Sequence, residues 1–323
     1  MITITKTCQN GQLDTISEFE RNSWIHLSDP TREEIERVSQ STNISASTLK
    51  VALDPEEFAH IDIEDGVYMV VLDIPIIEKE NEVYVFSTVP IGLIYNKDFF
   101  VSVCLKETSI IKDLWANRVK GIETRKQVRL LLQIVQRTEF KYLQYLKRID
   151  KTSNVVQQRL HQSVKNNELI DLLDIEKSLV YFSTSLSGND RVLYKIQRTD
   201  DFKKYEEDVD LLDDVINDNK QAIEMCNIYR DILSGTMDAF ASVISNNLNI
   251  IMKTLTILTL IMTIPQIISS LWGMNVNVPF ENNPFGFWIV LGGCVVVSLV
   301  GGLVLKKLSN STDKGRRLRR RPK

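Results

Sequence analysis

Two long apolar stretches near the C-terminus constrain this 323-residue chain more than any other feature. Leu255–Trp272 and Phe285–Leu305 are almost free of charge. Each is about long enough to cross a bilayer core of about 30 Å at about 1.5 Å per residue. The chain before Lys253 is rich in charged residues. We therefore expect two transmembrane helices that follow a large charged domain.

The distribution of charge predicts how these helices lie in the membrane. Residues 306–323 hold nine of the 39 Lys and Arg residues and one of the 42 Asp and Glu residues, which leaves 30 basic against 41 acidic residues before them. A basic segment directly after a transmembrane helix indicates a cytoplasmic location. Two crossings then place the N-terminal domain in the cytoplasm, and residues 1–13 lack the pattern of a signal peptide. We expect a multi-pass cell-membrane protein with both termini inside, in contact with membrane lipid.

The four cysteines show no metal-ligand spacing, and a reducing cytosol would keep them as thiols. We interpret them as packing residues.

The first hundred residues and the middle of the chain have different patterns. No proline lies between Phe99 and Ile264, and apolar residues recur at helical spacing over 126–162, 168–198 and 205–271. The third segment predicts one continuous helix on the order of 100 Å long that enters the membrane. A bend near Ser234 and Gly235 is the alternative.

Strands are expected in the N-terminal part, because short β-rich runs alternate with turn residues. A capped helix is expected after Asp29-Pro30-Thr31. The fold class is an α+β cytosolic domain followed by a long stalk helix and two C-terminal transmembrane helices. The expected strands are Ser23–Leu27, Val67–Ile77, Val83–Phe86 and Ile91–Leu105.

The expected segments are six. They are a cytosolic α/β domain (1–125), a cytosolic helical hairpin (126–204), a stalk helix continuing into the first transmembrane helix (205–271), an external loop (272–284), the second transmembrane helix (285–305) and a basic cytosolic tail (306–323).

A stripe of mostly polar residues follows one face of the first transmembrane helix. The spacings alternate between three and four, which is the period of one helix face. Polar groups within a membrane avoid lipid, so this face favours a bundle interior or a water-filled path. The alternative is that the threonines only bond to their own helix, as packing residues do. The stripe consists of Asn249, Met252, Thr256, Thr259, Thr263, Gln266 and Ser270.

Two transmembrane helices cannot enclose a pore, so conduction requires several copies of the chain. The second helix would form an outer layer, since Cys294, Ser298 and Gly302 lie four apart and suit close packing on the first. Pro265 predicts a kink and an unpaired carbonyl in the first helix.

Trp272-Gly273-Met274-Asn275 stands at the end of the first helix, and Val278-Pro279-Phe280-Glu281 and a second span follow. This arrangement resembles the CorA family of magnesium transporters, which has Tyr-Gly-Met-Asn at this place. Tyr229–Gly235 on the stalk and Asn249–Thr256 at membrane entry agree as well. This chain departs from the family in Trp272, in Thr263 where many relatives have methionine, and in the place of Pro265.

The resemblance implies a homopentameric funnel with a central pore lined by the first helix of each subunit. It implies that Gly273, Met274 and Asn275 form the selectivity filter and meet the hydrated ion at the outer mouth. Asn249, Met252, Leu255, Thr263 and Gln266 are expected to line the path, with Met252 and Leu255 at its hydrophobic constriction. Glu281 in the external loop would concentrate cations or be only a polar loop residue.

Magnesium suits this set of residues. Mg²⁺ gives up its water reluctantly, so amide and carbonyl oxygens can select it through its hydration shell. We expect Mg²⁺ to be transported passively, driven by the membrane potential, with Co²⁺ and Ni²⁺ as further candidates. The resemblance also places regulatory Mg²⁺ near Asp54, Asp213 and Asp214, where a bound ion would bridge subunits and hold the pore shut. Such charged runs are more often only solvated faces.

Two other hypotheses about the function stay open. One is a zinc transporter of the same superfamily, although no His or Cys lies on the polar face. The other is a membrane-anchored sensor or scaffold that conducts nothing. We expect neither an enzyme nor a nucleic-acid partner, because no paired catalytic groups or phosphate-binding loop stands out.

Overall fold

The computed structural model of the protein describes residues 1–8, 11–80, 83–116, 118–119, 121–162, 166–274 and 284–319. The chain forms two compact units, Met1–Met237 and Asp238–Lys323. Helix α6 (Glu206–Trp272) begins in the first unit and ends in the second. It is continuous through Ser234 and Gly235, so the alternative of a bend there is not needed.

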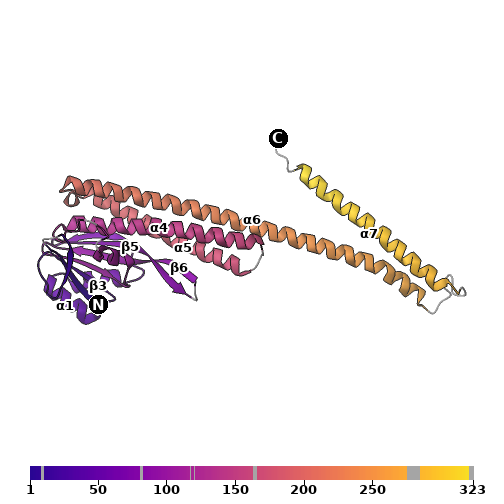
Figure 1. Ribbon diagram of the computed structural model, residues 1–323, viewed down its shortest axis with the longest axis horizontal. Coiled ribbons are helices and arrows are strands. Elements are labelled where there is room, and N and C mark those ends of the chain that lie inside the picture. The colour runs from indigo at the N-terminus through magenta and orange to yellow at the C-terminus, as the bar shows by residue number, and fades with distance from the viewer. Residues whose placement is uncertain are drawn as a thin grey trace. The chain divides into compact units, whose positions relative to one another are not determined.

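Unit 1 is built on a mixed seven-stranded sheet with the order β2-β1-β3-β7-β6-β5-β4 (Figure 1). Neighbouring strands are antiparallel except β3 and β7, which are parallel. The strands are β1 (Ile2–Thr7), β2 (Leu13–Ile16), β3 (Ser23–Ser28), β4 (His60–Glu64), β5 (Val67–Glu80), β6 (Val83–Tyr95) and β7 (Phe99–Cys104).

Both faces of the central strands are buried, because successive side chains point to opposite sides. Trp24 and Val70 belong to one hydrophobic cluster, and the next residues, Ile25 and Val71, belong to the other. Apolar burial on two faces explains why these strands read as continuous apolar runs. The sheet is therefore the middle layer of unit 1.

Helix α1 (Arg32–Thr42) covers one face of the sheet. It begins with the expected cap: the Thr31 hydroxyl accepts from the Glu34 amide, and the Glu34 carboxylate accepts from the Thr31 amide. Its buried Ile35 and Val38 join the cluster of Ile25 and Val71. The same side carries α2 (Ala46–Lys50) and the 3-10 turn η1 (Val51–Leu53).

Gly92 on β6 allows η1 to pack closely, since a Cβ there would lie 2.9 Å from the Cβ of Ala52.

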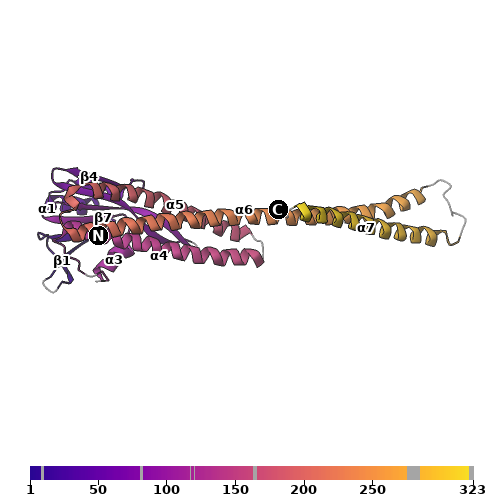
Figure 2. The same ribbon diagram turned by 90° about the horizontal axis from the view of Figure 1, so that it is seen from above.

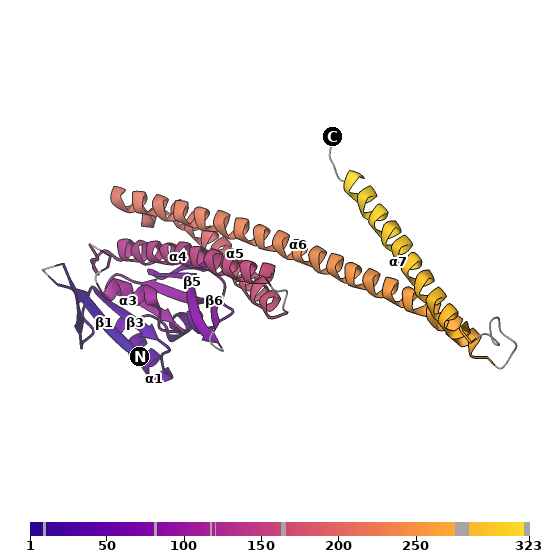
Figure 3. The ribbon, with the colours of Figure 1, turned by 45° about the vertical axis from the view of Figure 1, so that its right-hand side comes forward.

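Helices cover the opposite face of the sheet (Figure 3). They are α3 (Ser109–Trp115), α4 (Gln127–Gln162) and α5 (Asn166–Arg198), which the turn η2 (Asp200–Phe202) follows. The backbone of Asp73 on β5 anchors two of them: its carbonyl accepts from the Tyr142 hydroxyl at 3.1 Å and from the Asn189 amide at 2.9 Å. Figure 2 shows the first part of α6 lying over α4 and α5.

Sequence analysis located the long helices and the central strands, but not β1, β2 or β4, and it divided the central strands differently. It expected Val83–Phe86 and Ile91–Leu105 as separate runs, whereas β6 is continuous from Val83 to Tyr95. Pro90 lies inside β6 and opposite Asp73 of β5. The pairing of β6 with β7 begins only at Ile91, so Pro90 has no ladder bond to β7 for which an amide would be needed.

Unit 2 consists of the last part of α6 and α7 (Gly286–Arg319), which turns back from the end of α6 and lies at an angle to it in Figure 1. Both helices are long and apolar enough to cross a membrane. Helix α6 runs through Pro265, so the carbonyl of Ile261 has no amide partner at that position. Helix α7 continues to Arg319, and its basic end is therefore helical.

Candidate functional site

The polar stripe lies on one uncovered face of α6. All seven of its residues fall within the helix, and their side chains are exposed in the single chain, as is that of Leu255. The face runs from Asn249 to Ser270, two residues before the helix ends at Trp272. It is thus available to another copy of the chain or to water.

Helix α7 packs on the opposite side of α6. The half-buried residues there include Ile257, Ile261, Ile264 and Ile268, about half a turn from the polar stripe at about 100° per residue. A Cβ on Gly302 would lie 3.1 Å from Ile261 Cδ1. Because α7 contacts α6 on the side of Ile261, it leaves the polar stripe on the other side uncovered.

The threonine hydroxyls on the polar face donate to their own helix. Thr256, Thr259 and Thr263 each bond to the carbonyl four residues earlier, at 2.8 Å. Because each hydroxyl proton is donated to a backbone carbonyl, the hydroxyl oxygens present only acceptor lone pairs outward. The waters around a hydrated cation are hydrogen-bond donors. The face can therefore accept from a hydrated cation although each threonine also makes the bond expected of a packing residue.

The predicted filter lies where α6 ends. The Gly273 amide donates to the Ser269 carbonyl at 3.0 Å, and the Met274 amide to the Leu271 carbonyl at 3.4 Å, which closes the last turn. Gly273 and Met274 are exposed. Asn275 and Glu281 lie outside the residues that the structure describes.

The predicted regulatory carboxylates are all exposed, Asp54 after η1 and Asp213 and Asp214 on α6. Asp54 follows η1 and accepts from the Glu56 amide at 3.0 Å, and Asp213 on α6 accepts from the Gln197 side chain at 2.9 Å. Asp214 is the next residue of α6. Within the described part of one chain, no three His, Cys, Asp or Glu residues are grouped to hold a metal ion.

Two buried acidic residues were missed by the sequence analysis. Asp113 on α3 pairs with Arg118, Arg137 and Lys141. Glu139 on α4 is fully buried, and neither carboxylate oxygen has a hydrogen-bond partner within the described residues. Burial raises the pKa of Glu139 well above its ordinary value, and the Asp218 and Asp190 carboxylates add to this. Its helical spacing from Val135 and Tyr142, both buried, was the signal available in the sequence.

Comparison with known families decides what this arrangement belongs to. The sequence profile of the family described as CorA-like Mg²⁺ transporter protein matches residues 19–307. The chain belongs to this family. The matched region includes both apolar helices and nearly all of unit 1, so the CorA-like assignment covers both units.

Individual CorA proteins agree with the assignment. The cobalt/magnesium transport protein CorA of Methanocaldococcus jannaschii is 28% identical over 316 residues, covering 93% of this chain and 96% of that protein. The protein of the same name from Thermotoga maritima is 22% identical over 295 residues, covering 88% of this chain and 82% of that protein.

The fold agrees with a full-length CorA structure. The complete structure of the CorA magnesium transporter from M. jannaschii superposes with a TM-score of 0.81 at 25% identity, covering 94% of this chain and 96% of that chain. The predicted fold class, an α+β domain, a long helix and a C-terminal apolar helix, is thereby confirmed. As a CorA-like protein, the chain is a multi-pass membrane protein of a transporter family.

Proposed function

We propose that this protein transports divalent cations, principally Mg²⁺, across the cell membrane through a pore formed by several copies of the chain. One observation carries the proposal: the polar face of α6 is exposed along its whole length, and α7 packs on the opposite side. Such a face is unfavourable in lipid, so copies of α6 would turn it toward a shared water-filled path. The CorA-like family of Mg²⁺ transporters supports the same role.

The chemistry of this face favours a hydrated hard cation. Thr256, Thr259 and Thr263 offer acceptor oxygens, to which Asn249, Gln266 and Ser270 add amide and hydroxyl groups. Mg²⁺ holds its water tightly, and these groups can bind its hydration shell without removing it. Gly273, Met274 and Asn275 would serve as the filter, and Met252 and Leu255 as the constriction. Co²⁺ and Ni²⁺ are expected to pass as well.

Zinc is less well matched, because it prefers imidazole and thiolate ligands. The polar stripe contains neither.

The membrane potential is sufficient to drive entry. Two charges that cross about 100 mV gain about 4.6 kcal/mol, at about 2.3 kcal/mol per charge. The proposal includes a homopentamer surrounded by membrane lipid, both termini in the cytoplasm, and the loop 272–284 outside, where Glu281 would attract cations. We expect no enzymatic activity.

Cytosolic Mg²⁺ would close the pore. Asp213 and Asp214 lie on α6, and Asp54 directly follows η1 in unit 1. All three are exposed. Carboxylates of neighbouring subunits could jointly hold Mg²⁺ there, and loss of the ion would let their mutual repulsion open the assembly.

Ion flux through the purified protein tests the proposal. The full chain is reconstituted into liposomes, and entry of Mg²⁺ is followed with an internal dye while a potassium gradient sets the potential. We expect Mg²⁺ entry that increases with inside-negative potential and is lost in Asn275→Ala. Faster uptake of radioactive zinc than of Mg²⁺ would favour the zinc transporter. Absence of any cation flux through the wild-type protein, with no difference between it and Asn275→Ala, would favour the scaffold.

A further inference from the structure

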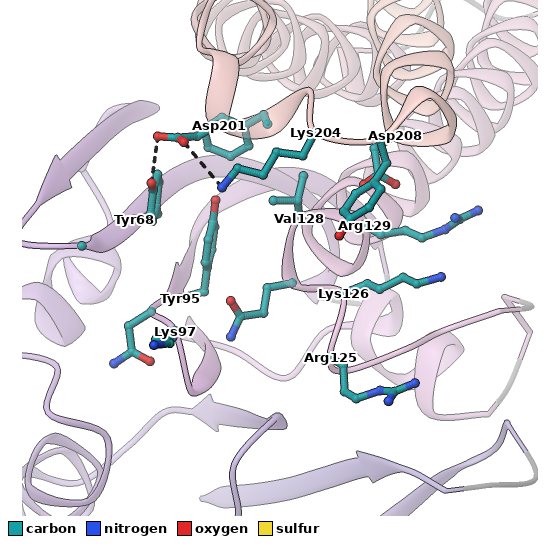
Figure 4. A pocket seen from close by; sticks show the side chains of 15 residues that line it. Tyr68, Tyr95, Lys97, Arg125, Lys126, Val128, Arg129, Asp201, Lys204 and Asp208 are labelled. Carbon is teal, nitrogen blue, oxygen red and sulfur yellow. Dashed lines mark hydrogen bonds and ion pairs between the residues drawn. The ribbon is translucent and has the colours of Figure 1, made fainter.

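A hollow in unit 1, far along the chain from the polar face, has the features of a ligand site. It has a volume of about 410 Å³ and lies between the starts of α4 and α6 and the sheet strands β5 and β6 (Figure 4). Small-molecule sites commonly have volumes of about 300 to 1,000 Å³. The hollow is thus large enough for a nucleotide-sized molecule.

The lining of the hollow is cationic, although residues 1–305 as a whole are acidic. Five basic side chains line it, against the carboxylates of Asp201 and Asp208. Within the described residues Lys97 has no ion-pair partner. The five are Lys97, Arg125, Lys126, Arg129 and Lys204.

Existing ion pairs do not neutralise this group firmly. Arg125 and Lys126 share the single carboxylate of Glu123, at 3.7 and 3.2 Å. Arg129 pairs with the largely exposed Glu207, and the exposed Lys204 pairs with Asp201 at 3.6 Å. Exposed pairs contribute about 0 to 1 kcal/mol each. An anion that enters the hollow can therefore replace them.

The first turn of α4 adds a second anion-binding element. Helix α4 has 36 residues and no acidic residue in its first turn, where Arg129 lies instead. The first amides of a helix have no carbonyl partner within it and form its positive end. Cations at that end are unfavourable unless an anion joins them, and helix starts of this kind bind phosphate.

Two unpartnered polar groups also line the hollow. The side chain of Asp208 is buried, its residue only 3% exposed, yet its Oδ1 has no hydrogen-bond partner among the described residues. The buried Nε2 of Gln127 likewise has none. A buried acceptor and a buried donor without partners are costly. Together they call for a ligand that both donates and accepts hydrogen bonds, which a simple inorganic anion such as sulfate does not.

Aromatic rings form one wall. Tyr68 and Tyr95 are stacked, with ring centroids 4.8 Å apart and planes 2° apart, and Phe202 meets both edge-on. The Tyr68 hydroxyl donates to Asp201 at 2.8 Å, which fixes its ring. Figure 4 shows Tyr68 and Tyr95 on one side of the hollow and Arg125, Lys126 and Arg129 on the other. A flat heterocycle and a phosphate can thus be bound at opposite sides.

We propose that this hollow binds a nucleotide, with its phosphates on Arg125, Lys126 and the first turn of α4, its sugar hydrogen-bonded to Asp208 and its base against Tyr68 and Tyr95. Helix α6 begins at the hollow and carries the proposed pore face at its other end. A nucleotide bound there would thus contact the same helix that lines the path.

Calorimetric titration of the full chain in detergent tests the proposal, with ATP and ADP as probes at a fixed free Mg²⁺ concentration. We expect saturable binding with a Kd below about 1 mM, weakened about tenfold or more by the double variant Arg125→Ala, Lys126→Ala and also weakened by Asp208→Asn. The matched control is Lys147→Ala, Lys151→Ala, which removes two exposed charges farther along α4 and should leave binding unchanged.

Two further probes identify which part of the ligand is recognised. Pyrophosphate and adenosine should each bind more weakly than ATP. Pyrophosphate binding as tight as ATP would overturn the nucleotide assignment, and so would the absence of saturable ATP binding or equal losses in both double variants.

Amine labelling of the unmodified chain provides a measurement without substitutions. ATP should protect Lys97, Lys126 and Lys204 from an amine-reactive reagent and leave Lys147 and Lys151 labelled; equal labelling with and without ATP would contradict the proposal. None of these measurements depends on ion flux, so they stand or fall separately from the transport function.

Discussion

The carboxylate of Asp113 on α3 lies 2.9 Å from the ammonium group of Lys141 on α4. It also accepts from the Arg137 guanidinium of the same helix, and Arg118 bonds its other oxygen at 2.6 Å. Asp113 and Lys141 are both buried. This group of charges therefore fixes α3 against α4 at the edge of the sheet's covered face.

Asp113→Asn should destabilise the protein by about 2 to 4 kcal/mol at pH 7, because it leaves the buried Lys141 and the half-buried Arg137 without their carboxylate. Burial by itself would raise the pKa of Asp113, but the hydrogen bonds from Lys141 and Arg137 outweigh it and lower the pKa to about 2. The ionised form is thus favoured by folding. Its stabilisation is complete above the unfolded pKa of about 4 and is lost as the pH falls toward 2.

Urea unfolding of the full chain in detergent measures this effect between pH 7 and pH 2. The difference between wild type and Asp113→Asn should shrink below pH 4. Asp174→Asn, at an exposed position of α5, is the control and should change stability by less than about 0.5 kcal/mol. A constant difference across the whole pH range would mean that the charge of Asp113 is not what stabilises the contact.

Glu139→Gln should have the opposite sign. Burial, then the Asp218 and Asp190 carboxylates, raise the pKa of Glu139 in the folded protein, so folding favours its neutral form. As the pH rises above the unfolded pKa of about 4.3, the unfolded state ionises first and wild type loses stability relative to the variant. The variant should be more stable than wild type at pH 7, by about 1.4 kcal/mol for each unit of raised pKa, and similar to it near pH 4.

Thermal unfolding at pH 4 and pH 7 checks this prediction. Glu176→Gln, at a partly exposed position of α5, provides the control and should behave as wild type at both values. A variant that is less stable than wild type at pH 7 would show that ionised Glu139 has a partner in the folded protein.

Much of the fold could be predicted from the sequence because its long helices bury one regular face. Leu130, Ile134 and Leu146 on α4 are all fully buried at helical spacing. The edge strands β2 and β4 were not predicted. Most of their side chains are exposed or partly exposed, so backbone pairing places them and no apolar alternation marks them.

The candidate sites also have a part that could be predicted from the sequence and a part that could not. The polar stripe is local to one helix and could be read from its spacing, whereas the side on which α7 packs depends on tertiary contacts such as Gly302 with Ile261. The hollow beside Asp208 could not be predicted, because β5, β6, α4 and α6 all contribute to it. Residues far apart in the sequence meet there only after folding.

Gly302→Val should separate α7 from α6. A Cβ at this position would lie 3.1 Å from Ile261 Cδ1, so Ile261 would have to shift to admit a branched side chain. Overpacking of this kind costs about 1 to 3 kcal/mol. We expect a lower melting temperature in detergent and slower Mg²⁺ flux in liposomes. Gly293→Val is the matched control, since nothing lies within 4 Å of a Cβ there. Equal effects of the two variants would point to the helix backbone rather than to this contact.

A comparison of two single variants, Thr259→Val and Thr254→Val, tests whether the polar face conducts ions. Both hydroxyls donate at 2.8 Å to the carbonyl four residues earlier, and both side chains are exposed in the single chain. They differ in position: Thr259 belongs to the polar face, whereas Thr254 lies beside Ile257 and Gly302 on the side of α7. Valine keeps the shape of threonine and removes its oxygen.

Loss of the Thr259 oxygen removes one acceptor for the hydration shell of a passing cation, which we expect to raise the barrier by about 1 kcal/mol. Mg²⁺ flux in liposomes should therefore fall roughly fivefold in Thr259→Val. It should stay within about a factor of two of wild type in Thr254→Val, with equal amounts of folded protein confirmed for both. Equal fluxes in the two variants would place the ion path away from this face of α6.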